Sequence, residues 1–168
     1  MVKNGIGIWV YMTHTQADAS VTGFGATSWG AIYSARRNQL EQLRTDVNGM
    51  RTSHPDDVFF LMGDFNVMGE DRFPPGSPDQ QEYTTVLADV LGPQISGGMD
   101  AARHFWPRNL GPTFSHTNDL MKYYYPSLGI EESGRLDYII AVNSLSRKVV
   151  IETTNYQVLK PQSAGITA

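Results

Sequence analysis

The stretch Leu61-Met62-Gly63-Asp64-Phe65-Asn66-Val67 decides how the rest of the chain is interpreted. It ends an apolar run that predicts a buried strand over 58–62. Side chains two residues apart on a strand point to the same face, so Asp64 and Asn66 are expected to converge if the strand continues to its end. Gly63 would let the backbone come close. A carboxylate that can hold a hard cation, beside an amide that can donate to a phosphate oxygen, suits metal-assisted phosphoester hydrolysis.

The same residues also suit an ordinary turn, because Gly, Asp and Asn often end strands. Polar residues near two other predicted strands favour the functional interpretation. His14 follows an apolar strand predicted over 5–12, and Asp137 lies inside a strand predicted over 135–142. A carboxylate embedded in so apolar a strand is expected to need a partner, because burying an unpaired charge is costly. Polar clusters on three β segments predict a site along one edge of a sheet.

The remaining pattern predicts an α/β layered fold. Apolar residues at roughly helical spacing predict a surface helix over 31–50 with one buried stripe. Asp57, in the break after this helix, is expected to be a turn or exposed residue. The other predicted elements are a short helix over 81–91, a mostly irregular segment over 94–125 with a short strand at 113–115, and a strand over 148–158.

Length and composition narrow the class of protein. The 168 residues suffice for one domain with a core. The absence of cysteine excludes disulfides and thiolate metal sites. A net charge of −4 argues mildly against sequence-independent nucleic-acid binding, which depends on Lys and Arg. No apolar run is long enough for a transmembrane helix, and residues 1–6 do not have the apolar region of a secretory signal.

Three motifs carry a family resemblance: Thr13-His14-Thr15-Gln16-Ala17-Asp18, Gly63-Asp64-Phe65-Asn66-Val67 and Arg135-Leu136-Asp137-Tyr138-Ile139. Their order and spacing resemble the endonuclease/exonuclease/phosphatase superfamily, which has a DNase I-like fold. Within it, the first motif and the helix carrying Arg36, Arg37, Gln39 and Leu40 are most similar to secreted neutral sphingomyelinases. The matching blocks span roughly residues 6–142.

The resemblance implies a fold and an activity. The fold would be the C-terminal portion of a DNase I-like two-sheet α/β sandwich, with residues 1–168 forming a single partial domain. The activity would be metal-dependent phosphodiester hydrolysis in the full-length parent, most similar to sphingomyelin phosphodiesterase and using Mg²⁺ or another divalent cation. The substrate would carry a phospholipid headgroup. A nuclease acting on nucleic acid, and an inactive fragment or binding module, stay open as alternatives.

The resemblance also implies roles for four residues. Asp64 would orient or deprotonate the attacking water near the metal, and Asp64 and Asn66 would be the metal ligands left in this chain. Asn66 would hydrogen-bond the phosphate. His14 would contact the phosphate and stabilise its developing charge. Asp137 would orient a catalytic histidine.

The sequence departs from the family at both ends. Family members carry an Asn motif and a Glu metal ligand before the Thr-His strand, and a Ser-Asp-His block one strand after the Asp-Tyr strand. This chain begins at the Thr-His strand and ends at Ala168, about where that block is expected. It is therefore interpreted as a fragment that lacks the histidine that Asp137 would orient. Arg135 could contact phosphate or pair with a carboxylate, and both alternatives stay open.

Overall fold

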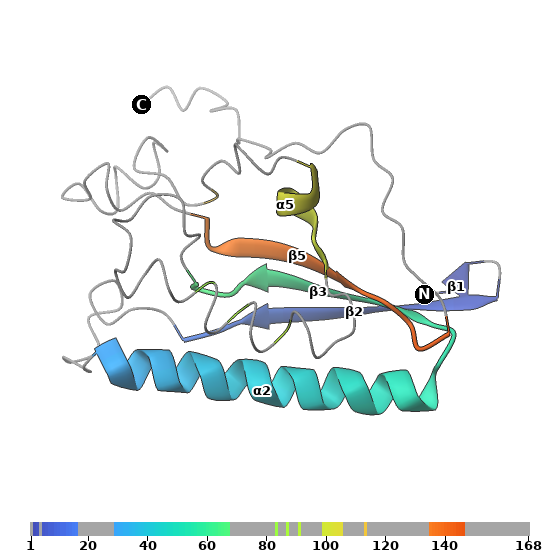
Figure 1. Cartoon of the computed structure of the whole chain (residues 1–168), viewed down its shortest axis with the longest axis horizontal. Helices are drawn as coiled ribbons and strands as arrows, with labels where there is room; N and C mark the ends of the chain where they lie inside the picture. Colours follow the sequence, from blue (N-terminus) through green and yellow to red (C-terminus); the bar gives the residue numbers. More distant parts are fainter. Residues whose placement is uncertain are drawn as a thin grey trace, which may run out of the picture.

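The computed structural model describes residues 2–3, 5–16, 29–67, 83, 87, 91, 99–105, 113 and 135–146. Five strands form one mixed sheet in the order β1-β2-β3-β5-β4, and α2 runs along one face of it (Figure 1). β2 and β3 are parallel, whereas β5 is antiparallel to β3. The predicted α/β fold is therefore confirmed. The strands are β1 (Val2–Lys3), β2 (Ile6–His14), β3 (Val58–Asp64), β4 (Met99–Asp100) and β5 (Asp137–Val142).

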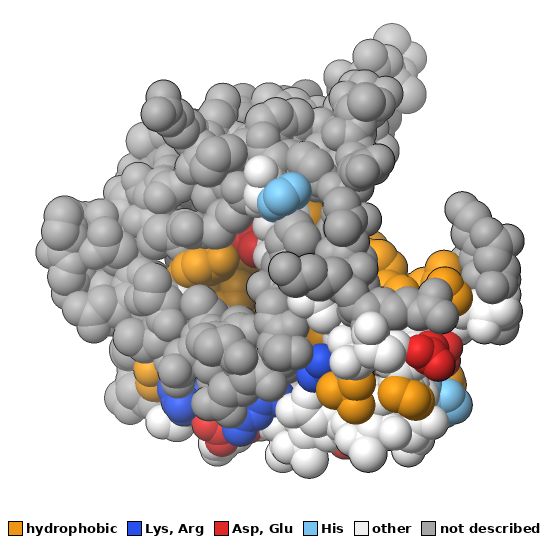
Figure 2. Space-filling view, turned by 45° about the vertical axis from the view of Figure 1, so that its right-hand side comes forward, with side chains coloured by type: hydrophobic (Ala, Val, Ile, Leu, Met, Phe, Trp, Pro, Cys, Tyr) orange, Lys and Arg blue, Asp and Glu red, His pale blue; other side chains and the backbone are white. Residues whose placement is uncertain are grey.

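Helix α2 (Trp29–Ser53) packs on the sheet through one apolar stripe. Leu40 and Val47 are fully buried and Ile32 nearly so, and their spacing places them on one side of the helix. The other side is polar, and charged side chains gather over α2 along the lower edge of the molecule in Figure 2. The helix continues past the predicted end at residue 50. There, Arg51 Nε donates to the Asn143 carbonyl at 2.9 Å, which ties the last turn to the end of β5.

The core lies between α2 and the sheet. Alternate residues of β3 and β5 face it, as the two-residue period of a strand requires. Tyr83, Leu87 and Leu91 are buried in the same core, and their spacing of four agrees with the short helix predicted over 81–91, whose other residues lie outside the described ones. The core residues are Leu40, Val47, Phe59, Leu61, Phe65, Val67, Tyr83, Leu87, Leu91, Tyr138, Ile140 and Val142.

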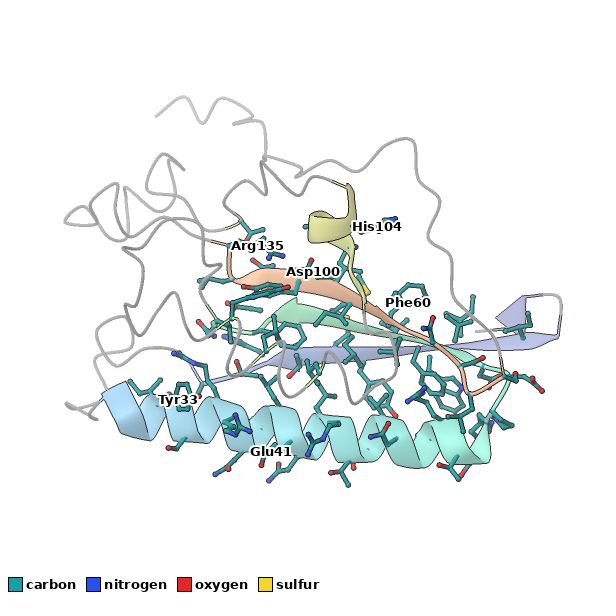
Figure 3. The ribbon with its side chains drawn as sticks, in the orientation of Figure 1. Tyr33, Glu41, Phe60, Asp100, His104 and Arg135 are labelled. Atoms are coloured by element: carbon teal, nitrogen blue, oxygen red, sulfur yellow. The ribbon has the colours of Figure 1, made fainter. Side chains whose placement is uncertain are left out.

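The opposite face of the sheet is more open. Val10 is 50% exposed and Met12 is 73% exposed. Phe60, on the neighbouring strand, points away from α2 (Figure 3). The described residues form one sheet, so the second sheet of the predicted sandwich is not among them. Within the same part of the chain, no helix is both long and apolar enough to cross a bilayer.

Two short elements were not predicted. β4 and the five-residue helix α5 (Ala101–Phe105) lie in the segment that was expected to be mostly irregular. β4 depends on a distant partner, because its Asp100 pairs with Ile140 of β5, and such a partner leaves no local periodic signal. α5 begins at a local contact, in which Oδ1 of Asp100 accepts the Ala102 N–H at 3.1 Å. Of the strand predicted at 113–115 only Thr113 is described, and the strand predicted over 148–158 lies outside the described residues.

The two alternatives for Arg135 are resolved in favour of a carboxylate partner. Nη1 of Arg135 lies 2.9 Å from Oδ2 and 3.0 Å from Oδ1 of Asp100, and the two side chains lie together beside β5 (Figure 3). The guanidinium carbon stands 4.2 Å from the centroid of the Tyr138 ring. Because Arg135 is only 3% exposed, it is almost inaccessible to solvent, and its bonds to Asp100 anchor the start of β5.

Asp57 closes the expected turn, because its N–H donates to the His54 carbonyl at 3.2 Å, but it is not an exposed residue. Its side chain is only 18% exposed, and it accepts hydrogen bonds from Gly7 N at 2.7 Å and from Trp9 Nε1 at 2.8 Å. His54 Nδ1 lies 3.5 Å away. These partners on β2 are far away in the sequence, so the local turn signal could not reveal them. Asp57 therefore joins the turn before β3 to the beginning of β2.

This arrangement predicts a pH-dependent contribution to stability. The bonds from Trp9 and Gly7, with the nearby His54, hold the pKa of Asp57 below its ordinary value. The folded state thus favours the carboxylate, and its contribution is fully present above the ordinary pKa of about 3.9. Asp57→Asn is expected to lower the Tm by several degrees at neutral pH, because an amide nitrogen cannot accept one of these bonds. Thermal unfolding followed by circular dichroism measures the change.

The matched control is Asp46→Asn, which removes the same charge from an exposed position on α2. It should leave the Tm nearly unchanged. The difference in Tm between the wild type and Asp57→Asn should shrink only below about pH 4, as the pH falls through the lowered folded pKa of Asp57. A difference that stays constant into the acid range would contradict this account.

Candidate active site

The sheet places three of the predicted site residues in one row. His14 pairs with Asp64 in the β2–β3 register, and Asp64 pairs with Asp137 in the β3–β5 register. The ends of β2 and β3 therefore meet the start of β5 at one edge of the sheet, on the left in Figure 1. The expected grouping of polar residues at a sheet edge is observed, whereas the roles of the individual residues stay predictions.

His14 and Asp64 are close but not in tight contact. Nε2 of His14 lies 3.8 Å from Oδ2 of Asp64. The His14 side chain is 72% exposed and that of Asp64 is 33% exposed. Both side chains are therefore accessible to a ligand that approaches this edge.

Asp64 and Asn66 meet through a turn and not through strand geometry, which corrects the expectation that the strand continues. β3 ends at Asp64, and Asn66 has a positive φ of 48°, a left-handed conformation that asparagine tolerates well. The Asn66 N–H donates to Oδ1 of Asp64 at 2.8 Å. An aspartate side chain that accepts the backbone N–H two residues later forms an Asx turn.

Gly63 is required immediately before this turn. Its φ is +129°, and a Cβ placed on it would lie 2.1 Å from the Thr13 carbonyl oxygen on β2. The expected close approach of the backbone at Gly63 is thus found, and the neighbouring segment is the end of β2.

The expectation for Asp137 was partly wrong. Asp137 is the first residue of β5 and is exposed, so its carboxylate is not buried inside the strand and does not need a compensating partner. The strand begins two residues later than predicted. Instead, Oγ1 of Thr113 accepts the N–H groups of Leu136 and Asp137 at 3.0 and 3.1 Å. This contact fixes the backbone where β5 enters the sheet.

Burial raises the pKa of Asp64 above its ordinary value, and the carboxylate of Asp137 acts in the same direction. The hydrogen bond from the Asn66 N–H opposes this effect, as do His14 and Arg36. The net result is a carboxylate that holds a proton more readily than an exposed one. Such a group can accept a proton from a bound water.

Thr15 is a buried part of the site to which the sequence analysis gave no role. It is 5% exposed; its N–H donates to the Asp64 carbonyl at 3.0 Å, and its hydroxyl donates to the Phe65 carbonyl. Its own carbonyl accepts Nδ2 of Asn66 at 2.9 Å. The only sequence signal for a role of Thr15 was its place inside the first motif, and that place did not distinguish it from the neighbouring residues of the motif.

Arg36 is the second residue without a predicted role. It is 1% exposed, and its Nη1 donates to the Gln16 carbonyl at 3.2 Å. A signal existed, because Arg36 lies four residues from both Ile32 and Leu40 and so falls on the buried stripe of the helix. A charged residue on an apolar stripe indicates a specific buried partner.

The residues at this edge can be compared with the needs of Mg²⁺. Mg²⁺ is usually bound by one or two carboxylates together with waters and substrate phosphates. Asp64 supplies a carboxylate, and Asn66, which is turned back to it, supplies an amide oxygen. The carboxylate of Asp137 on the neighbouring strand adds negative charge that a cation would offset. Asp64 and Asn66 thus fit a partly hydrated ion. Within the described part of the chain, no group of three or more acidic or histidine side chains is close enough to form a metal cluster.

Comparisons with known proteins give matches in structure only. No protein-family model matches the sequence, and no curated protein is significantly similar to it. The crystal structure of SmcL matches with a TM-score of 0.56 and 24% identity over 84% of this chain. A crystal structure of beta toxin from Staphylococcus aureus matches with a TM-score of 0.55 and 20% identity over 94% of this chain. The chain has the DNase I-like fold.

The likeness covers only part of the matched proteins. The chain spans 40% of SmcL and 48% of that beta toxin. A further beta toxin structure, with bound magnesium ions, matches with a TM-score of 0.52 and 20% identity, over 84% of this chain and 39% of that protein. The superfamily resemblance carried by the three motifs is thereby confirmed at the level of the fold.

Proposed function

We propose that this chain contributes one edge of the active site of a metal-dependent phosphodiesterase, most similar to sphingomyelin phosphodiesterases that release phosphocholine. The observation that carries the proposal is the row of His14, Asp64 and Asp137 across three neighbouring strands, with Asn66 turned back to Asp64. The fold shared with SmcL and beta toxin supports it.

In this proposal Asp64 takes the proton from a water that attacks phosphorus in line. As the new P–O bond forms, the P–O bond to the lipid alcohol breaks, and the departing alcohol oxygen takes a proton from solvent. The place of Asp64 at the sheet edge supports its role as proton acceptor, because its side chain is 33% exposed and therefore accessible to a water. A Mg²⁺ ion bound by Asp64 and Asn66 would stabilise the negative charge on the phosphate oxygens. The magnesium in the matched beta toxin supports a divalent cation.

His14 and Asn66 bind the phosphate in this proposal. The exposed imidazole of His14 reaches solvent at the sheet edge and contacts a phosphate oxygen there. Asn66 Nδ2 has two donors, of which one bonds the Thr15 carbonyl. The second donor then bonds a phosphate oxygen. Asp137 orients a histidine supplied from elsewhere in the complete site.

The substrate is a phospholipid headgroup in this proposal, and the net charge of −4 weighs against nucleic acid. The experiment offers sphingomyelin vesicles and plasmid DNA in parallel to the natural polypeptide that contains this chain, with Mg²⁺ or with EDTA. Phosphocholine release that EDTA abolishes, without cleavage of DNA, is the expected result. EDTA-sensitive nicking of DNA alone would favour the nuclease, and no turnover on either substrate would favour an inactive or binding module.

A further inference from the structure

Helix α2 is hydrogen-bonded to Gln16, the residue that follows Thr15. The N–H of Gln16 donates to Oε1 of Gln39 at 2.9 Å, and the carbonyl of Gln16 accepts Nη1 of Arg36 at 3.2 Å. Both backbone groups of one residue are therefore held by side chains of a single helix. These two bonds help to hold the backbone of Gln16 in place just past the end of β2.

The position of Gln16 affects the site through its neighbour Thr15. Its neighbour Thr15 makes two contacts with the segment after β3, from its N–H to the Asp64 carbonyl and from its hydroxyl to the Phe65 carbonyl. The Thr15 carbonyl holds Nδ2 of Asn66 at 2.9 Å. A shift of Thr15 and Gln16 would therefore move the Asn66 amide away from its place beside Asp64.

Arg36 and Gln39 differ in burial. Arg36 is 1% exposed, so its guanidinium is held in one place with Nη1 3.2 Å from the Gln16 carbonyl. A rigid guanidinium presents several donors in a fixed fork, so it fixes geometry better than a flexible ammonium group. Gln39, by contrast, is exposed on α2, so changing it should cost little stability.

We propose that Arg36 and Gln39 are positioning residues of the phosphate site, because together they clamp Gln16 and thereby set the place of the Asn66 amide. The expected effect of the clamp on catalysis rests on the proposed function. Whether the clamp forms does not depend on activity, because the clamp consists of hydrogen bonds within the chain.

The test compares Gln39→Leu, which removes the acceptor, with Gln39→Glu, which keeps an oxygen acceptor. Asn38→Ala, at an exposed neighbouring position on α2, is the matched control. Gln39→Leu is expected to speed amide hydrogen exchange at Gln16 about fivefold and to shift the side-chain NH₂ signals of Asn66 in ¹H–¹⁵N spectra. Gln39→Glu should restore both, and Asn38→Ala should change neither.

The second variant is Arg36→Lys, which keeps the charge but loses the guanidinium fork. It should produce the same shift of the Asn66 signals. Exchange at Leu61, in the centre of β3, reports global stability. If exchange at Leu61 rises by the same factor as at Gln16 in both variants, the residues are merely structural and the proposal is overturned.

Activity gives the third measurement. In a polypeptide that hydrolyses sphingomyelin, Gln39→Leu should lower kcat about tenfold with a smaller change in KM, because a misplaced amide affects the transition state most. Gln39→Glu should recover most of kcat. Unchanged kcat with altered Asn66 signals would overturn the positioning role. If wild type hydrolyses no phosphodiester, the proposed function fails, while exchange at Gln16 and the Asn66 signals still decide whether the clamp exists.

Discussion

Asp64→Asn is expected to lower the rate of phosphodiester hydrolysis by about 100- to 10,000-fold while making the folded chain more stable at neutral pH. The loss of rate follows from removing a positioned proton acceptor, which typically contributes that factor. Asparagine keeps the size of the side chain and an oxygen that can accept the Asn66 N–H, so the turn after β3 should persist. Initial rates of phosphocholine release with saturating Mg²⁺ measure the first effect.

The gain in stability follows from the sign of the pKa shift. Because burial and Asp137 raise the pKa of Asp64 in the folded state, the folded chain disfavours its ionised form. This destabilising contribution is fully present above the raised pKa and disappears as the pH falls below the ordinary value of about 3.9. Thermal unfolding in EDTA should therefore give a higher Tm for Asp64→Asn at pH 7 and equal values at low pH.

Asp46→Asn is the control for both measurements, because it removes a charge from an exposed position on α2 that has no role in the proposed site. It should change neither rate nor stability by much. A rate for Asp64→Asn within threefold of wild type would show that Asp64 is not the proton acceptor. A lower Tm at pH 7 would show that the carboxylate is stabilised in the fold and not penalised.

Gly63→Ala is expected to destabilise the chain by about 3–5 kcal/mol, a loss typical of strained backbone and severe core clashes. The new Cβ would lie 2.1 Å from the Thr13 carbonyl oxygen, and a backbone atom of a paired strand cannot rotate away as a side chain can. The φ of +129° is also unfavourable for alanine. Urea unfolding followed by tryptophan fluorescence measures the change.

The chain offers a control with the same chemical change. Gly49 lies inside α2, and a Cβ placed there would meet no atom within 4 Å. Gly49→Ala should stabilise the chain by about 0.5–1 kcal/mol, because alanine favours the helix interior. If Gly63→Ala were as stable as wild type, the close approach of β2 and β3 beside the site would be wrong.

The periodic elements could be predicted from the sequence. The ends predicted for the strand at 58–62 and the helix at 31–50 lie within three residues of the observed ends. The apolar run of the strand and the helical spacing of apolar residues in the helix indicate which residues are buried. The strand ending in Asp64 ran two residues longer than predicted. β2 likewise continues from the predicted end at residue 12 to His14. Polar residues at strand ends carry no hydrophobic pattern, so such boundaries stay uncertain.

Contacts between distant segments could not be predicted. Asp57 reaches β2 and Arg135 reaches Asp100 through partners that no local pattern specifies. The left-handed turn at Asn66 was missed because a strand-like pattern of side chains was extended past the end of β3. The row of His14, Asp64 and Asp137 was nevertheless anticipated, since strand ends in one sheet tend to meet at an edge.

The central claim is that the edge formed by His14, Asp64, Asn66 and Asp137 binds a divalent cation together with a phosphodiester. The most direct measurement adds Mn²⁺, as a paramagnetic substitute for Mg²⁺, to the ¹⁵N-labelled chain in the presence of glycerophosphocholine, a soluble phosphodiester. The account predicts that amide signals of these four residues broaden first, and that Asp64→Asn abolishes the effect. Broadening centred elsewhere, or unchanged by Asp64→Asn, would contradict it.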